Sequence, residues 1–203
     1  MTEKEYKLPY KIGLISTHGT GKTALVYGLA GEFKKKGYNV EIISEVATKL
    51  SKQGYPINQN TNLPAQFSIL LHQMIEELSP LAKKHDCDII ITDRTVTTDN
   101  LVYLDRACGP NPFIPKITEF MMNYAELYPY SKIYLLPLIG KLEKNGVRDL
   151  DKEFQSDIYV RLVKLLKDKK IEHIELPIPQ KTDPTRKEWL KIIIKETLKD
   201  LKK

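Results

Sequence analysis

The chain has 203 residues, of which 41% are hydrophobic and 29% charged, a balance typical of a single folded domain with a substantial core. No apolar stretch is long enough to span a bilayer, so the sequence excludes transmembrane helices and predicts no membrane partner. The formal net charge of +6 favours acidic ligands such as nucleotides, although much of the excess lysine falls at predicted helix ends and tails, where it keeps the surface solvated.

The first residues, 1–7, have neither the apolar core nor the small-residue cleavage site of a secretory signal, which predicts a cytoplasmic location. In that compartment Cys87 and Cys108 are expected to stay reduced. The sequence has no internal repeat, low-complexity tract or linker, so residues 1–203 are predicted to form one domain.

Five apolar runs separated by helical segments predict the alternation of strands and helices that builds a parallel sheet. A longer amphipathic helix is expected over residues 67–78, an ordered surface loop over Cys108–Pro115, and a closing helix after Asp183-Pro184. The predicted fold class is therefore α/β, with a mostly parallel five-stranded sheet and helices on both faces. The predicted strands are Tyr10–Ile15, Val40–Ser44, Asp88–Thr92, Lys132–Leu138 and Ile171–Leu176.

The segment from Ser16 to Thr23, with the sequence STHGTGKT, joins the first strand to the helix that follows. It nearly matches the phosphate-binding pattern G-x-x-x-x-G-K-[ST], with Ser16 at the first glycine position, where extended backbone would suit a serine. Lys22 is expected to reach the β- and γ-phosphates, and the Thr23 hydroxyl to coordinate Mg²⁺. Because such a loop directs backbone N–H groups at a polyphosphate, the predicted nucleotide-binding residues are Thr17, His18, Gly19, Thr20, Gly21, Lys22, Thr23 and Ala24.

Polar residues follow the second and third predicted strands, at the sheet edge where doubly wound folds bind their ligands. Asp93 is predicted to act in catalysis by holding Mg²⁺ directly or through water, with the N-cap of the next helix as the alternative role. Glu45 is a candidate to bind the acceptor and to accept the proton of its hydroxyl group, or else an ordinary acid in the first turn of a helix. Arg94 is expected to bind a phosphate or carboxylate of the acceptor through its planar guanidinium group.

Residues 140–165, after the fourth predicted strand, are expected to contain a lid segment that closes over the nucleotide. Arg148 in this segment is a catalytic candidate, because phosphoryl transfer requires a cation that neutralises the charge on the moving group. The alternative is that Arg148 forms a surface ion pair with Asp149 or Asp151, which would contribute little.

With these motifs in order along most of the chain, the sequence resembles the P-loop nucleoside and nucleotide kinase superfamily, and within it the ATPase-like domain group that includes ribosylnicotinamide kinases. The resemblance implies a three-layer P-loop NTPase fold, ATP or GTP at the phosphate-binding loop, Mg²⁺ near Thr23 and Asp93, and an acceptor near Glu45 and Arg94. It also implies an adenine-contacting loop over residues 177–183. The segments that carry it are STHGTGKT, Ile43-Ser44-Glu45, Ile91-Thr92-Asp93-Arg94 and Asn145-Gly146-Val147-Arg148.

The favoured hypothesis is a Mg²⁺-dependent kinase that transfers the γ-phosphoryl group of ATP to a small nucleoside- or nucleotide-like acceptor. The main alternative is a P-loop NTPase that acts as a nucleotide-dependent switch or binding protein for a macromolecular partner, although the sequence lacks the Asn-Lys-x-Asp motif of familiar switch GTPases. A polynucleotide 5′-kinase is a third alternative, and nucleic acid the less favoured partner, because only the positive charge supports it. The sequence leaves open the identity of the acceptor, the preferred base and whether the chain forms a homodimer.

Overall fold

A computed structural model of the chain describes residues 8–44, 46–82, 86–138, 152–179 and 186–202. Within these ranges five strands form one sheet in the order β2-β3-β1-β4-β5, and all four pairings are parallel. The strands are β1 (Tyr10–Ile15), β2 (Val40–Ile43), β3 (Ile89–Thr92), β4 (Lys132–Leu135) and β5 (Ile174–Glu175).

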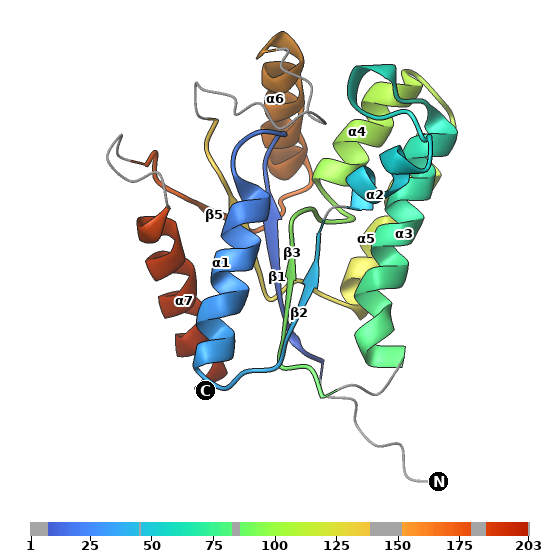
Figure 1. Cartoon of the computed structure of the whole chain (residues 1–203). Coiled ribbons are helices and arrows are strands. Elements are labelled where there is room, and N and C mark those ends of the chain that lie inside the picture. Colours follow the sequence, from blue (N-terminus) through green and yellow to red (C-terminus); the bar gives the residue numbers. More distant parts are fainter. Residues whose placement is uncertain (1–7, 45, 83–85, 139–151, 180–185, 203) are drawn as a thin grey trace, which may run out of the picture.

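Helices connect consecutive strands, as parallel pairing requires, because the chain must return to the other end of the sheet before the next strand begins. One face of the sheet carries α1 and α7, and the other carries most of the remaining helices (Figure 1). In the described part of the chain the helices are α1 (Lys22–Lys35), α2 (Val46–Lys52), the short 3-10 helix η1 (Asn58–Asn60), α3 (Leu63–Ala82), α4 (Asp99–Cys108), α5 (Ile114–Leu127), α6 (Lys152–Asp168) and α7 (Lys187–Leu201).

The core lies in two layers, one on each face of the sheet. Ile12 and Leu14 of β1 point to the face covered by α1 and α7, whereas Ile15 packs with Ile133 against α4 and α6. Because the central strands are buried on both faces, they are mostly apolar, as in β3, where Thr92 follows three isoleucines and all four residues are buried. The predicted α/β class and three-layer arrangement are confirmed, and the sheet is entirely parallel in the part that the structure describes.

Four strands are shorter than the sequence predicts, β2 and β3 by a single residue each and β4 and β5 by more. β4 ends at Leu135 instead of Leu138, and β5 comprises Ile174–Glu175 instead of Ile171–Leu176. In the part of the chain that the structure describes, β5 is an edge strand beside β4, and the ladder between them pairs Tyr134 with Ile174 and Leu135 with Glu175. Apolar character alone therefore overestimates strand length at this edge, because Leu136 and Leu176, just past the two strands, are apolar through their burial in the core.

The prediction of a surface loop over Cys108–Pro115 is wrong at both ends. α4 includes Cys108, and α5 begins at Ile114 with Pro115 in its first turn. Proline is tolerated at this position since the N–H groups of a first helical turn have no acceptor within the helix. The connection between the two helices is therefore shorter than its proline and glycine content suggests.

The parallel arrangement brings the carboxyl ends of all strands to one edge of the sheet. The phosphate-binding loop leaves β1 at this edge, and residues 93–99 leave β3 beside it. Within the described ranges, none of the helices combines the length and the apolar character needed to cross a bilayer.

Candidate nucleotide-binding site

The loop between β1 and α1 is folded around the place where a phosphate would bind. Gly19 and Gly21 have φ angles of +75° and +91°, a region that residues with side chains rarely adopt. Thr20 Oγ1 donates a hydrogen bond of 3.1 Å to the Thr17 carbonyl and closes the turn. Because α1 begins at Lys22, the N–H groups of its first turn and the positive end of its dipole face the place where an anion would bind.

Ser16 replaces the first glycine of the pattern without a left-handed backbone. It is absent from the described residues with positive φ, as the sequence predicts for a serine at this place. Its Oγ donates a hydrogen bond of 2.9 Å to the carbonyl of Leu136, just past β4. The serine therefore fastens the start of the loop to the neighbouring strand, a contact that glycine could not make.

The ammonium group of Lys22 lies inside the loop. It donates hydrogen bonds of 2.9 Å to the Ser16 carbonyl and 2.6 Å to the Thr17 carbonyl, and the side chain is almost completely buried. Carbonyl groups are weaker partners for a cation than phosphate oxygens are. A bound polyphosphate would therefore offer Lys22 a better partner at the position where the ammonium already lies.

Thr23 and Asp93 meet at the same edge of the sheet, although 70 residues separate them. Thr23 Oγ1 lies 3.5 Å from Asp93 Oδ2. Asp93 does not cap the next helix, because α4 begins six positions later at Asp99 with Thr98 as its N-cap residue. A hydroxyl and a carboxylate oxygen are the ligand types that Mg²⁺ takes beside substrate phosphates and water, so these two residues fit the predicted ion.

Beside the loop is a cleft whose walls also include the end of β3, α2 and η1. Arg94 lines this cleft, and its guanidinium carbon lies 4.5 Å from the ring centroid of Tyr103. Stacking of this kind holds a guanidinium group in place while leaving its edge available to an anion. Residues that line the cleft are His18, Gly19, Lys22, Thr23, Val46, Ala47, Thr48, Ile57, Asn58, Asp93 and Arg94.

His18 is held by the elements around the loop. Its Nδ1 lies 3.4 Å from the Tyr103 hydroxyl, and its ring centroid lies 5.4 Å from that of Phe154 in α6. The His18 carbonyl accepts a hydrogen bond of 2.7 Å from Gln155 Nε2. His18 therefore connects the loop to the first turn of α6, most of which falls within the predicted lid.

Two of the predicted catalytic residues, Glu45 and Arg148, lie outside the described residues. Glu45 comes directly before α2, whose first residue, Val46, lines the cleft. Of the predicted lid, residues 152–165 belong to α6, which packs Phe154 and other apolar residues into the core.

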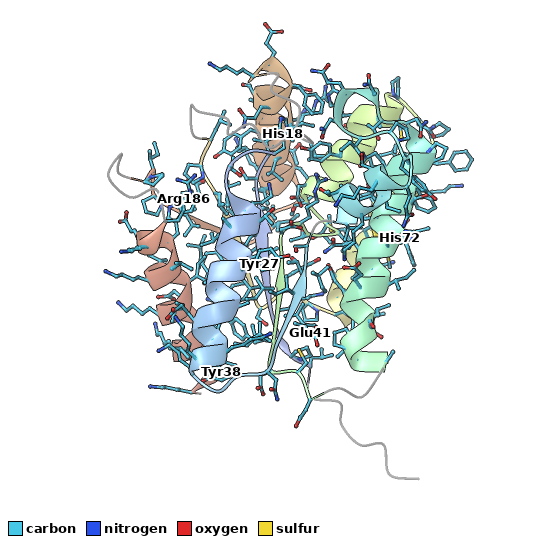
Figure 2. The ribbon with its side chains drawn as sticks, viewed as in Figure 1. His18, Tyr27, Tyr38, Glu41, His72 and Arg186 are labelled. Atoms are coloured by element: carbon cyan, nitrogen blue, oxygen red, sulfur yellow. The ribbon has the colours of Figure 1, made fainter. Side chains whose placement is uncertain are left out.

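Arg186 was not identified from the sequence, yet it contacts the phosphate-binding loop. Its Nη2 donates a hydrogen bond of 3.4 Å to the Thr20 carbonyl, and a Cβ atom at Gly21 would lie 3.2 Å from its Nε. The guanidinium carbon also lies 4.8 Å from the ring centroid of Trp189, whose Nε1 donates to the Pro177 carbonyl at 2.7 Å. Figure 2 labels Arg186 and His18 at the end of the molecule that carries the loop.

These contacts make Trp189, the single tryptophan of the chain, a natural reporter of nucleotide binding. We expect a saturable change in its fluorescence when ATP is titrated, because Arg186 joins the indole to the loop. Arg186→Ala should remove most of that change, whereas Arg161→Ala on the exposed side of α6 should leave it intact. Equal amplitudes in the two variants would show that the loop and the indole are not connected in this way.

Asp99, at the start of α4, is the second residue that the sequence did not assign to the site. It is completely buried, and its Oδ1 accepts a hydrogen bond of 2.8 Å from the Thr95 N–H group. Burial raises the pKa of this carboxyl from 3.8 to about 6, while the positive charges of Lys22 and Arg94 oppose the rise and Asp93 adds to it. Asp99 is thus a buried acid close to the charged groups of the cleft.

The raised pKa predicts how stability depends on pH. The folded chain binds the Asp99 proton more tightly than the unfolded chain, so this group lowers the free energy of unfolding as pH rises from about 4 to about 6. Asp99→Asn keeps the acceptor for Thr95 but cannot ionise. We expect the stability of this variant relative to wild type to grow by on the order of 2 kcal/mol across that window, measured by urea denaturation. Asp105→Asn, at the exposed end of the same helix, should follow the wild-type pH profile; an Asp99→Asn profile parallel to wild type would contradict the assignment.

The fold and the site together define the class of protein. A parallel sheet of order β2-β3-β1-β4-β5, whose first strand leads through the phosphate-binding loop into α1, is a P-loop NTPase fold. Residues 11–185 match the AAA_28 family of AAA domains, and the chain belongs to this family. The resemblance to P-loop kinases seen in the sequence is confirmed.

The similar proteins include a kinase and a protein whose structures contain nucleotide ligands. A tetraacyldisaccharide 4'-kinase of Haemophilus influenzae (strain 86-028NP) is 30% identical over 189 residues, which cover 73% of this chain and 55% of that protein. The crystal structure of NadR protein in complex with NR aligns with a TM-score of 0.71 and 14% identity, covering 92% of this chain and 51% of that one. NadR protein in complex with NAD and AMP-PNP gives a TM-score of 0.66 at 11% identity, with 92% and 49% covered. The chain therefore spans about half the length of these proteins.

Proposed function

We propose that this protein is a Mg²⁺-dependent kinase that transfers the γ-phosphoryl group of ATP to a small nucleoside- or nucleotide-like acceptor. The observation that carries the proposal is the meeting of Lys22, Thr23 and Asp93 in one cleft, with Thr23 Oγ1 only 3.5 Å from Asp93 Oδ2. A phosphate-binding lysine and oxygen ligands for Mg²⁺ are the groups that phosphoryl transfer requires. Further support comes from the similarity to a tetraacyldisaccharide 4'-kinase and to NadR structures that hold NR or AMP-PNP.

In this proposal the loop and the end of β3 act on the triphosphate. Lys22 exchanges the Ser16 and Thr17 carbonyls for phosphate oxygens and stabilises the charge on the transferred group. Thr23 and Asp93 hold the ion, which neutralises phosphate charge when it is bound.

The acceptor would bind in the part of the cleft formed by α2 and Arg94. Arg94 would bind an anionic or hydroxyl group of the acceptor, and Glu45, directly before the cleft residue Val46, would orient the reacting hydroxyl group and accept its proton. Arg148 would neutralise charge from the lid. This role is proposed for Arg148 because it precedes α6 in the sequence, and Gln155 of α6 contacts the phosphate-binding loop.

The proposal is tested by incubating the purified chain with γ-labelled ATP or GTP, Mg²⁺ and a panel of nucleosides, nucleotides and sugars. We expect label to appear on one class of acceptor, and to depend on Mg²⁺. Slow release of labelled phosphate with no labelled acceptor would reject the kinase proposal and favour the nucleotide-dependent switch. Label on a sugar alone would keep the kinase chemistry and overturn the nucleoside-like acceptor.

A further inference from the structure

A buried polar network lies beneath the candidate site, and its centre is the carboxylate of Glu77 in α3. Glu77 Oε2 pairs with Lys11 Nζ of β1 at 3.0 Å and accepts a hydrogen bond of 3.1 Å from the Tyr124 hydroxyl of α5. Glu77 Oε1 accepts hydrogen bonds of 2.7 Å from the Tyr130 hydroxyl and 3.0 Å from Gln73 Nε2. We call these five residues the Glu77 network; their contacts join β1, α3, α5 and the segment before β4.

Two members of the network also bind the backbone of residues 93–99, the segment that carries Asp93 and Arg94. The Val96 N–H group donates a hydrogen bond of 3.0 Å to the Tyr130 hydroxyl, and Gln73 Nε2 donates one of 3.2 Å to the Arg94 carbonyl. The same carboxylate oxygen therefore orients both side chains that grip this segment. The Tyr124 hydroxyl also donates to Glu77, at 3.1 Å, but among the hydrogen bonds of the described residues it makes none to residues 93–99, which distinguishes it from Tyr130.

The protonation state of Tyr130 fits this arrangement. Burial, with the Glu77 charge as the next cause, raises the pKa of the Tyr130 phenol well above its ordinary value, so the phenol keeps its proton. A neutral hydroxyl group can donate to Glu77 and accept from Val96 at the same time. A buried ion pair such as Lys11–Glu77 is by itself weak support for stability, because desolvation offsets most of the attraction.

We propose that the Glu77 network positions the segment of residues 93–99, with Tyr130 and Gln73 as positioning residues that keep Asp93 beside Thr23. The inference rests on the proposed function, in which these two residues hold Mg²⁺. Partners that orient metal ligands without touching the ion commonly govern metal affinity. The phosphate-binding loop has no contact with the network among the hydrogen bonds described, so nucleotide binding without Mg²⁺ should be independent of it.

The two tyrosines provide a matched test. Tyr130→Phe and Tyr124→Phe each remove one hydroxyl group that donates a hydrogen bond to Glu77. Only Tyr130→Phe also removes a hydrogen bond to residues 93–99. ATP affinity is measured by calorimetry with Mg²⁺ and with a chelator. We expect the increase in ATP affinity that Mg²⁺ causes to be about tenfold smaller in Tyr130→Phe than in wild type. Its ATP affinity in the presence of the chelator should equal that of wild type. Tyr124→Phe should keep the full gain.

A second variant keeps the inference testable if Tyr130→Phe does not fold. Gln73→Leu has a similar volume and removes the hydrogen bond to the Arg94 carbonyl, so we expect it also to reduce the Mg²⁺-dependent gain. The inference would be overturned, with the proposed function left standing, if Tyr130→Phe and Gln73→Leu both kept the wild-type gain in ATP affinity from Mg²⁺. It would also be overturned if Tyr130→Phe and Tyr124→Phe lost that gain equally. If the wild-type protein binds ATP equally with and without Mg²⁺, the metal role of Asp93 fails and the inference fails with it.

Discussion

Lys22→Met is expected to lower ATP turnover by about 100-fold to 1000-fold, because it removes the cation that stabilises the charge of the transferred phosphoryl group. Lys22 Nζ lies within 2.9 Å of two carbonyl oxygens of the loop, at the position where it would also contact a bound phosphate. Methionine keeps the apolar stem of the side chain and so disturbs the packing little. Turnover and ATP affinity are measured on the same preparation, with thermal unfolding to check that the variant is folded.

Lys35→Met is the matched control, since it is the same substitution in the last turn of the same helix. Lys35 pairs with Glu32 at the exposed surface, where an ion pair contributes little. We expect its turnover to stay within about twofold of wild type. A folded Lys22→Met variant with wild-type turnover would mean that the loop does not act on a transferred phosphate.

Asp93→Asn is expected to lower Mg²⁺-dependent turnover by about 100-fold, because an amide is a much weaker ligand for a hard cation than a carboxylate. The Mg²⁺ concentration needed for half-maximal activity should rise with it. The 3.5 Å approach of Thr23 Oγ1 to Asp93 Oδ2 is the basis of this expectation. The measurement is turnover as a function of Mg²⁺ concentration at saturating ATP.

Asp88→Asn serves as the control, because Asp88 directly precedes β3 and Asp93 directly follows it. Asp88 Oδ2 accepts a hydrogen bond of 2.8 Å from the Asn39 N–H group, and asparagine retains that acceptor. Its Mg²⁺ dependence should match wild type. If both variants lost activity equally, the effect of Asp93 would come from damage to β3 and not from the metal.

The placement of the local parts of the candidate site could be predicted from the sequence. The glycine spacing of the phosphate-binding loop, Lys22, Thr23 and the acid after β3 are contiguous with the elements that position them, so periodicity and turn chemistry were sufficient. The same holds for the alternation of strands and helices, and hence for the parallel sheet. The ends of β5 were predicted wrongly because they depend on which residues of β4 pair with it. The loop before α5 was predicted too long because Pro115 is tolerated in the first turn of that helix.

By itself, the sequence determined the fold class and the phosphate-binding loop, because each depends on residue types within one short segment or on a regular repeat of apolar residues. The tertiary structure alone decided that Arg186 contacts Thr20, that Asp99 is buried beside charged groups, and that Glu77 joins Tyr130 across 53 positions of the chain. Such contacts depend on which helices pack on which face of the sheet. Because side chains from distant elements meet only after that packing is complete, no local pattern in the sequence indicates them.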